Sequence, residues 1–200
     1  PVAAANAAIR ARRASFEAIA NAGLNSTSNT LYERSFASVQ QRAVQFADRV
    51  NASIAGARPF VALPDAGVTL SPLKMISARA SLSMSRQVLF VSTGGFDTHD
   101  DLVADQPGLL GNVSNSIKTF FDALAEVGME NSVTLFTHSD FGRTLTSNGD
   151  GSDHAWGGVQ LVIGDAVLGR KIYGAYLLLQ IGGPRDVGGG RLIPTVSTNQ

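Results

Sequence analysis

Apolar residues recur every three to four positions through the first quarter of the chain, which predicts helices. Residues 2–22 are rich in alanine and are expected to form one helix that ends near Gly23. After a polar loop at residues 25–29, Thr30 is expected to begin a second helix, because Glu33 follows it at the spacing of a capping box. The pattern therefore predicts two successive helices joined by a short loop.

The second predicted helix has an apolar face, and it is expected to end at Gly56 and Pro59. Seven apolar residues share this face by their spacing: Tyr32, Phe36, Val39, Ala43, Phe46, Val50 and Ile54. We therefore expect a helical hairpin over residues 1–56 whose apolar face packs against the rest of the protein. A coiled-coil partner surface is the alternative, although the apolar seam is short for one.

From Phe60 onward, helical patterns alternate with short runs of β-branched and aromatic residues. One helix is expected to begin at Ser71-Pro72, and a longer one is expected over residues 109–127, where Gly128 stops it. The runs that predict strands are residues 88–92, 133–137 and 159–163, with a weaker short strand at residues 173–176.

Helices and strands that alternate in this way are typical of a parallel sheet with helices on its faces. We therefore expect one α/β domain over residues 1–200, with a mainly parallel sheet, helices on both faces and the helical hairpin in front. Residues 60–200 are expected to form the core that carries the functional site.

The composition suits a globular protein and argues against several functional classes. Sixteen basic residues balance sixteen acidic ones, so the charge gives no reason to expect a nucleic acid partner. The absence of cysteine excludes disulfides, thiolate metal ligands and a cysteine nucleophile. No apolar run reaches the roughly 20 residues that span a bilayer, and no signal-peptide pattern opens the chain. Because the chain begins at Pro1 without a methionine, we expect it to be a piece of a longer protein.

Three short clusters of histidine and aspartate hold all three histidines of the chain. They are residues 94–99, residues 138–144 and the dipeptide Asp153-His154. The first two follow predicted strands directly, and the third lies in a glycine-rich loop. In an open α/β sheet, ligands bind at the carboxyl ends of the strands. Aspartate and histidine together at that edge are typical ligands of a divalent metal.

The first cluster contains Asp97 and His99, two residues apart. In an extended segment their side chains point to the same side, so a carboxylate and an imidazole can reach one cation. An Asx-type turn with an incidental histidine explains the same residues equally well.

The second cluster offers Asp140, which is placed either to ligate a metal or to orient a ligating histidine. His138 would share its side if the strand continues. Arg143 carries a planar guanidinium group whose N–H donors suit phosphate, sulfate or carboxylate, and it is the candidate anion binder. Taken alone, this cluster is better explained by a capping turn with Arg143 in a structural salt bridge.

The third cluster lies among several glycines, and a loop of that kind is better suited to carrying ligands than to bracing the fold. Trp156 could stack on a substrate, but a place in the core is the favoured interpretation. The chain has no nucleophile elbow of a serine hydrolase, no phosphate-binding loop and no dinucleotide fingerprint.

Four motifs follow one another in order, and the first three overlap the clusters: residues 95–99, 139–144, 153–155 and 190–195. In these motifs the chain resembles a bacterial family called domain of unknown function 1501, which is placed in the alkaline phosphatase and sulfatase superfamily. The resemblance covers roughly residues 60–200. It implies an alkaline-phosphatase-like sandwich, and twin-arginine export to a periplasmic or other extracytoplasmic location.

The resemblance also implies a metal site and an activity. The implied ligands of one or two divalent metals (Zn, Mg, Mn or Ca) are Asp97, His99, Asp140 and His154, with Asp153 next. The implied activity is metal-dependent hydrolysis of phosphate or sulfate esters, with a small anionic substrate.

One feature of the superfamily is not found in this chain. The superfamily places a serine or threonine nucleophile near the start of the full protein, and residues 1–60 show no matching strand and turn. A non-catalytic exported protein that keeps the fold for binding or surface assembly is therefore the alternative.

Overall fold

The computed structural model describes residues 2–25, 30–57, 59–62 and 69–197, so most of the predicted loop at residues 25–29 lies outside the described residues. The chain divides into two structural units. One comprises Pro1–Arg58 and Lys74–Val88, and the other comprises Pro59–Leu73 and Leu89–Gln200. Each unit therefore combines segments that are distant in sequence.

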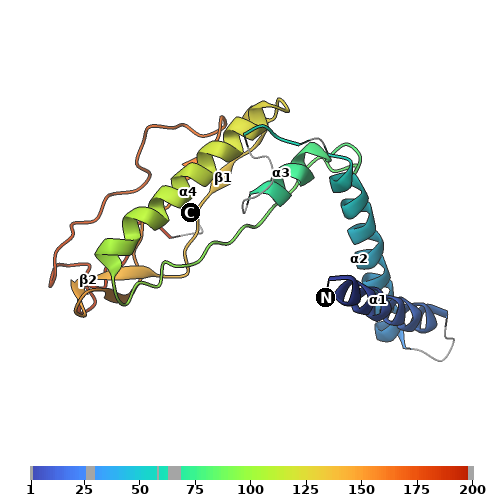
Figure 1. The fold of residues 1–200 in the computed structure, drawn as a ribbon. Coiled ribbons are helices and arrows are strands. Elements are labelled where there is room, and N and C mark those ends of the chain that lie inside the picture. Colours follow the sequence, from blue (N-terminus) through green and yellow to red (C-terminus); the bar gives the residue numbers. More distant parts are fainter. Residues whose placement is uncertain (1, 26–29, 58, 63–68, 198–200) are drawn as a thin grey trace. The chain divides into compact units, whose positions relative to one another are not determined.

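Two long helices, α1 (Val2–Asn25) and α2 (Leu31–Ala55), dominate the first unit and pack against each other (Figure 1). They run antiparallel, because Arg13 pairs with Asp48 while Gln41 donates to Asn21 at 2.9 Å. The apolar face predicted for α2 is largely exposed, at Tyr32 for example.

The predicted capping box of α2 is confirmed. The Glu33 backbone N–H donates to the Thr30 hydroxyl at 3.3 Å, and the Thr30 backbone N–H donates to the Glu33 carboxylate at 2.7 Å. The hydrogen bond from the Thr30 backbone lowers the pKa of Glu33. At its other end α2 is capped by Gly56, as the sequence predicts.

A short helix, α3 (Leu70–Ser77), is divided between the two units. It begins at Leu70, so the prediction that Ser71 caps it is wrong, and Ser71 lies inside the first turn.

The second unit contains one long helix, α4 (Leu102–Ala125), which begins earlier than the sequence predicts and contains Pro107. A 3₁₀ turn, η1 (Glu130–Ser132), follows it. Four short strands complete the described part of the unit: β1 (Leu135–Phe136), β2 (Gly142–Ser147), β3 (Ser152–Ala155) and β4 (Val162–Ile163). Figure 1 shows that the chain after β4 runs as a long loop.

Apolar side chains around the carboxyl half of α4 are buried in the second unit. Those most deeply buried include Phe60, Leu73, Phe120, Ala123 and Leu124. The Glu126 carboxylate, just beyond α4, accepts hydrogen bonds from the backbone N–H groups of Val61 at 3.0 Å and Ala62 at 2.8 Å. The segment at residues 59–62 is thereby tied to the end of α4.

The prediction of a mainly parallel sheet in an alkaline-phosphatase-like sandwich is wrong. The described residues form two antiparallel sheets of two strands each, β1 with β4 and β2 with β3. The apolar runs at residues 133–137 and 159–163 do contain β1 and β4, but Leu135 lies opposite Ile163 in antiparallel register. A parallel pair needs a crossover connection that is usually helical. The connection here is the β2–β3 hairpin, so the helical crossover is missing.

Two other predicted strands, at residues 88–92 and 173–176, form no ladder in the structure. Val88 and Phe90 are almost fully exposed. An apolar run identifies a segment that suits a strand, but it does not identify a partner strand, and the described residues provide none for these segments.

The β2–β3 hairpin turns through residues 148–151, which read Asn-Gly-Asp-Gly. The Asn148 backbone N–H donates to the Gly151 carbonyl, and the Gly151 backbone N–H donates to the Asn148 side chain, each at 3.2 Å. Asn-Gly and Asp-Gly pairs are strong hairpin signals, so the sequence does contain a cue for this element.

A glycine-rich loop at residues 182–192 packs against β2, because the Leu145 backbone N–H donates to the Gly190 carbonyl at 3.0 Å. Asp186 organises this loop. Its carboxylate accepts hydrogen bonds from the backbone N–H groups of Gly182 and Gly188, each at 2.8 Å, and from Gly190 at 3.2 Å. These bonds, that from Gly182 first, lower the pKa of Asp186.

None of the described helices combines the length and the apolar character that a crossing of the membrane would require.

The capping box predicts the effect of Thr30→Ala. Loss of the hydroxyl leaves the Glu33 backbone N–H without its cap, so the free energy of unfolding should fall by about 1 kcal/mol. Urea denaturation followed by circular dichroism at 222 nm measures it. Ser35→Ala, at an exposed position inside α2, is the matched control and should be neutral or slightly stabilising. Equal effects of the two variants would contradict the assignment of the cap.

The Asp186 loop predicts a pH dependence. Because the pKa of Asp186 is lower in the folded protein than in the unfolded chain, its ionised form stabilises the fold. That stability is fully present above the ordinary pKa of about 3.9 and is lost as the pH falls through the lowered value. The amide signals of Gly182, Gly188 and Gly190 in ¹H–¹⁵N spectra should titrate together below that ordinary pKa. Asp186→Asn should abolish the titration, and a midpoint at or above the ordinary value would refute the arrangement.

Candidate metal site

Backbone hydrogen bonds bring the first and third clusters together. The Ser152 backbone N–H donates to the Thr98 carbonyl at 3.3 Å, and the Leu102 backbone N–H donates to the Asp150 carbonyl at 3.1 Å. A Cβ atom added at Gly151 would overlap the carbonyl of His99, so only glycine permits this approach. The segment at residues 97–102 is therefore fixed against the β2–β3 hairpin.

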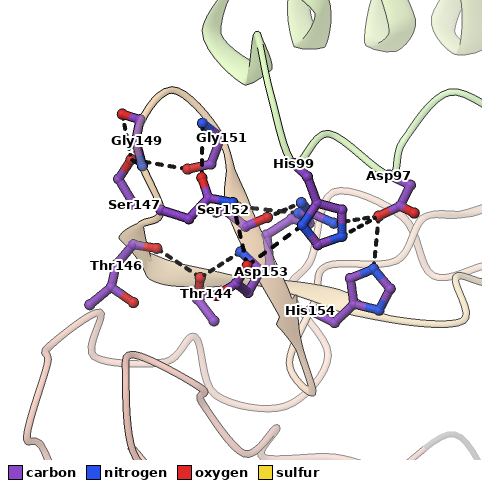
Figure 2. A network of polar contacts seen from close by, with 12 residues as sticks. Asp97, His99, Thr144, Thr146, Ser147, Gly149, Gly151, Ser152, Asp153 and His154 are labelled. Atoms are coloured by element: carbon purple, nitrogen blue, oxygen red, sulfur yellow. Dashed lines mark hydrogen bonds and ion pairs between the residues drawn. The ribbon is translucent and has the colours of Figure 1, made fainter.

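Within that segment, the side chains of Asp97 and His99 contact each other, but a tight turn brings them together in place of the predicted extended segment. The His99 backbone N–H donates to the Asp97 carbonyl at 3.0 Å, which makes a tight γ-turn with Thr98 at its centre. The side chain of Thr98 is buried, whereas the Nε2 atom of His99 lies 3.0 Å from Oδ1 of Asp97 (Figure 2).

Strand β3 supplies His154, whose Nε2 atom lies 2.7 Å from the same Oδ1 atom of Asp97. Figure 2 shows the carboxylate of Asp97 directed at the two imidazoles. Within the described part of the chain, Asp97, His99 and His154 form the one group of possible metal ligands, each offering one ligand atom within 4.8 Å of the others.

Arg143, on β2 opposite His154, adds a fixed positive charge. Its Nη1 atom donates to Oδ1 of Asp97 at 3.1 Å, its Nε atom donates to the Ser152 hydroxyl at 3.2 Å, and its Nη2 atom donates to the Ser152 carbonyl. The side chain is only 18% exposed. The structural salt bridge considered for Arg143 is present, and its role as an anion binder stays a prediction.

The convergence on Asp97 has an electrostatic consequence. The hydrogen bond with His154, the hydrogen bond from Arg143 and the charge of the two imidazoles hold the pKa of Asp97 below its usual range. The carboxylate, ionised at neutral pH in any case, therefore stays ionised further into acidic conditions, and the ionised form is the one that ligates a cation.

Asp153 faces the opposite nitrogen of His99. Its Oδ1 atom lies 3.5 Å from Nδ1 of His99 and accepts a hydrogen bond from Asn148 at 3.4 Å. A carboxylate on the second nitrogen of a ligating histidine fixes the orientation of the ring. The structure thus brings Asp153 to the site, behind His99 and outside the three-residue group.

The structure does not bring every predicted residue to this group. Asp140 and His138 are exposed on the segment between β1 and β2, and the group does not include them. Trp156 is 70% exposed, so its favoured assignment to the core is wrong.

Two residues near the group were not expected from the sequence: Ser152, which accepts from Arg143, and Phe141, whose ring is stacked on His154. Their place depends on the pairing of β2 with β3. The Asn-Gly-Asp-Gly turn is the sequence signal that could have revealed it.

The three residues form a donor set that suits a divalent cation. Two imidazole nitrogens and one carboxylate oxygen are used by catalytic zinc sites and by non-haem iron sites, which leave further positions open for water or substrate. Two further features agree with a metal site. The Asp97 carboxylate is ionised, and the second nitrogen of His99 faces the carboxylate of Asp153.

Comparison with known proteins identifies a family but no characterised relative. The family model described as "Protein of unknown function (DUF1501)" matches residues 6–178, which include most of the helical hairpin and all of the three-residue group. No curated protein and no solved structure matches the chain.

The close approach at Gly151 predicts the effect of Gly151→Ala. The added methyl group should push the segment at residues 97–102 away from the hairpin and separate Asp97 from His154. The imidazole ¹H–¹⁵N signals of His99 and His154 should shift. Gly94→Ala is the matched control, because a Cβ atom at Gly94 meets nothing within 4 Å. Unchanged imidazole signals in Gly151→Ala would show that this approach does not hold the site together.

Proposed function

Since the chain belongs to the family described as "Protein of unknown function (DUF1501)", its site is the guide to its activity, and we propose that it is a metal-dependent hydrolase of phosphate or sulfate esters. The single observation that carries the proposal is the gathering of Asp97, His99 and His154 within ligand distance of one another. These three residues would hold the cation.

The donor set favours some metals over others. Two imidazoles and a carboxylate suit Zn²⁺ or Mn²⁺ better than Ca²⁺ or Mg²⁺, which prefer oxygen ligands. A cation of this kind supplies Lewis-acid polarisation of an ester oxygen and stabilises the negative charge that develops there.

The surrounding residues would set the charge and the geometry of the site. Asp97 supplies the negative charge, and Asp153 orients His99 through its Nδ1 atom. Arg143 places a positive charge beside Asp97 that would attract an anionic ester. Because Ser152 holds two of its nitrogens, Arg143 would act by attraction more than by a bidentate clamp.

The proposal includes an extracytoplasmic location, which the resemblance of the motifs supports. Fractionation of cells that express the full-length protein tests it, and recovery from the cytoplasm alone would oppose it.

The proposal predicts that the chain binds Zn²⁺ or Mn²⁺ with one strong site per molecule in isothermal titration. Asp97→Asn and His154→Ala should each weaken the affinity by more than about 100-fold, since loss of an outer-shell partner alone costs about 10- to 100-fold.

His138→Ala is the control for these variants, because His138 is the one histidine outside the group. It should bind the metal as the unmodified protein does. Equal weakening by His138→Ala and His154→Ala, or no binding by the unmodified protein, would refute the metal site.

Turnover is tested on the full-length protein with a panel of phosphomonoesters, phosphodiesters and sulfate esters. Hydrolysis that depends on added metal and on Asp97 supports the enzyme. Metal binding without turnover of any ester would overturn the hydrolase and leave the non-catalytic binding protein as the explanation.

A further inference from the structure

The ring of Phe141 lies flat on the ring of His154, with centroids 3.9 Å apart and planes inclined by 6°. We infer that Phe141 is a positioning residue that holds the His154 imidazole in the orientation required for metal binding. This inference rests on the proposed metal site and assigns a role to a residue outside the ligand set.

His154 needs such support because it is held at only one of its two nitrogens. Its side chain is 49% exposed, and among the described residues Asp97, at Nε2, is its one polar partner. His99, by contrast, has a carboxylate at each nitrogen. The second nitrogen of a ligating histidine usually bonds to a partner that fixes the ring. At His154, the flat face of Phe141 takes the place of that partner.

The hairpin places Phe141 for this stacking. Gly142 is paired with Ala155 and Arg143 with His154, so Phe141 lies immediately before the paired residues. A Cβ atom at Gly142 would overlap the carbonyl of Gly157, which shows how closely the two segments approach at this point.

Arg143 also lies over the ring of Phe141. Its Cζ atom lies 5.6 Å from the centroid of the Phe141 ring while its Nη1 atom bonds to Asp97. A guanidinium over an aromatic face is attracted to it by the charge distribution of the ring. Phe141 thus lies against both the histidine and the arginine that converge on Asp97.

The test compares the Zn²⁺ affinity of Phe141→Leu and Phe141→Tyr. Leucine keeps the apolar character but removes the flat face, so the affinity should fall by about tenfold, the lower end of the range for an outer-shell partner. Tyrosine keeps the ring and should bind within about twofold of the unmodified protein. Phe136→Leu, on β1 and 67% exposed, is the matched control and should leave the affinity unchanged. Equal affinity of Phe141→Leu and the unmodified protein would overturn the inference.

A second measurement needs neither metal nor a folded variant. Stacking on Phe141 should shift the imidazole proton signals of His154 upfield relative to those of His138 in the metal-free protein, with nuclear Overhauser effects between the two rings. Absence of both signatures would overturn the positioning role. If the unmodified protein shows both but binds no Zn²⁺, the proposed metal site fails, and with it the metal-binding role of Phe141, while the stack itself stands.

Discussion

The arrangement of the site depends on one close contact between two backbone segments. The segment at residues 97–102 is hydrogen-bonded to the β2–β3 hairpin, both at its turn and at the first residue of β3. Ser152 donates to Thr98, Leu102 donates to Asp150, and Gly151 leaves no room for a side chain between the two segments. Asp97 and His154 are far apart in sequence, and this approach is what brings their side chains within 2.7 Å. The second of these hydrogen bonds ties Leu102, the first residue of α4, to the hairpin, so the start of the helix and the site are fixed together.

At the centre of the site, one carboxylate oxygen of Asp97 meets two imidazoles and a guanidinium. These neighbours stabilise the ionised carboxylate, so the pKa of Asp97 is lowered. Arg143 is anchored through Ser152 and lies against Phe141, so its charge is held in a fixed position. The site thus consists of a carboxylate and two histidines held by residues of one short hairpin.

Local features of the fold could be predicted from the sequence, and non-local ones could not. The box of Thr30 and Glu33 and the cap at Gly56 depend on residues within one turn, and both were identified. The start of α4 was missed because Gln106, Pro107 and Gly108 interrupt the helical pattern, while its true start is tied to Asp150. Strand direction was wrong because an apolar run does not encode its partner. For the site, the sequence named Asp97 and His99 as neighbouring candidates but did not predict the tight turn that brings their side chains together. The contacts of Phe141 and Ser152 follow only from the pairing of β2 with β3.

The central claim is that Asp97, His99 and His154 together bind one divalent cation. X-ray absorption spectroscopy of the Zn²⁺-loaded protein tests it most directly, because multiple scattering from imidazole rings counts the histidine ligands. The account predicts two imidazole nitrogens and at least one oxygen around the metal, with one imidazole lost in His154→Ala and none lost in His138→Ala. A shell without two imidazoles, or one that loses an imidazole in His138→Ala, would contradict it.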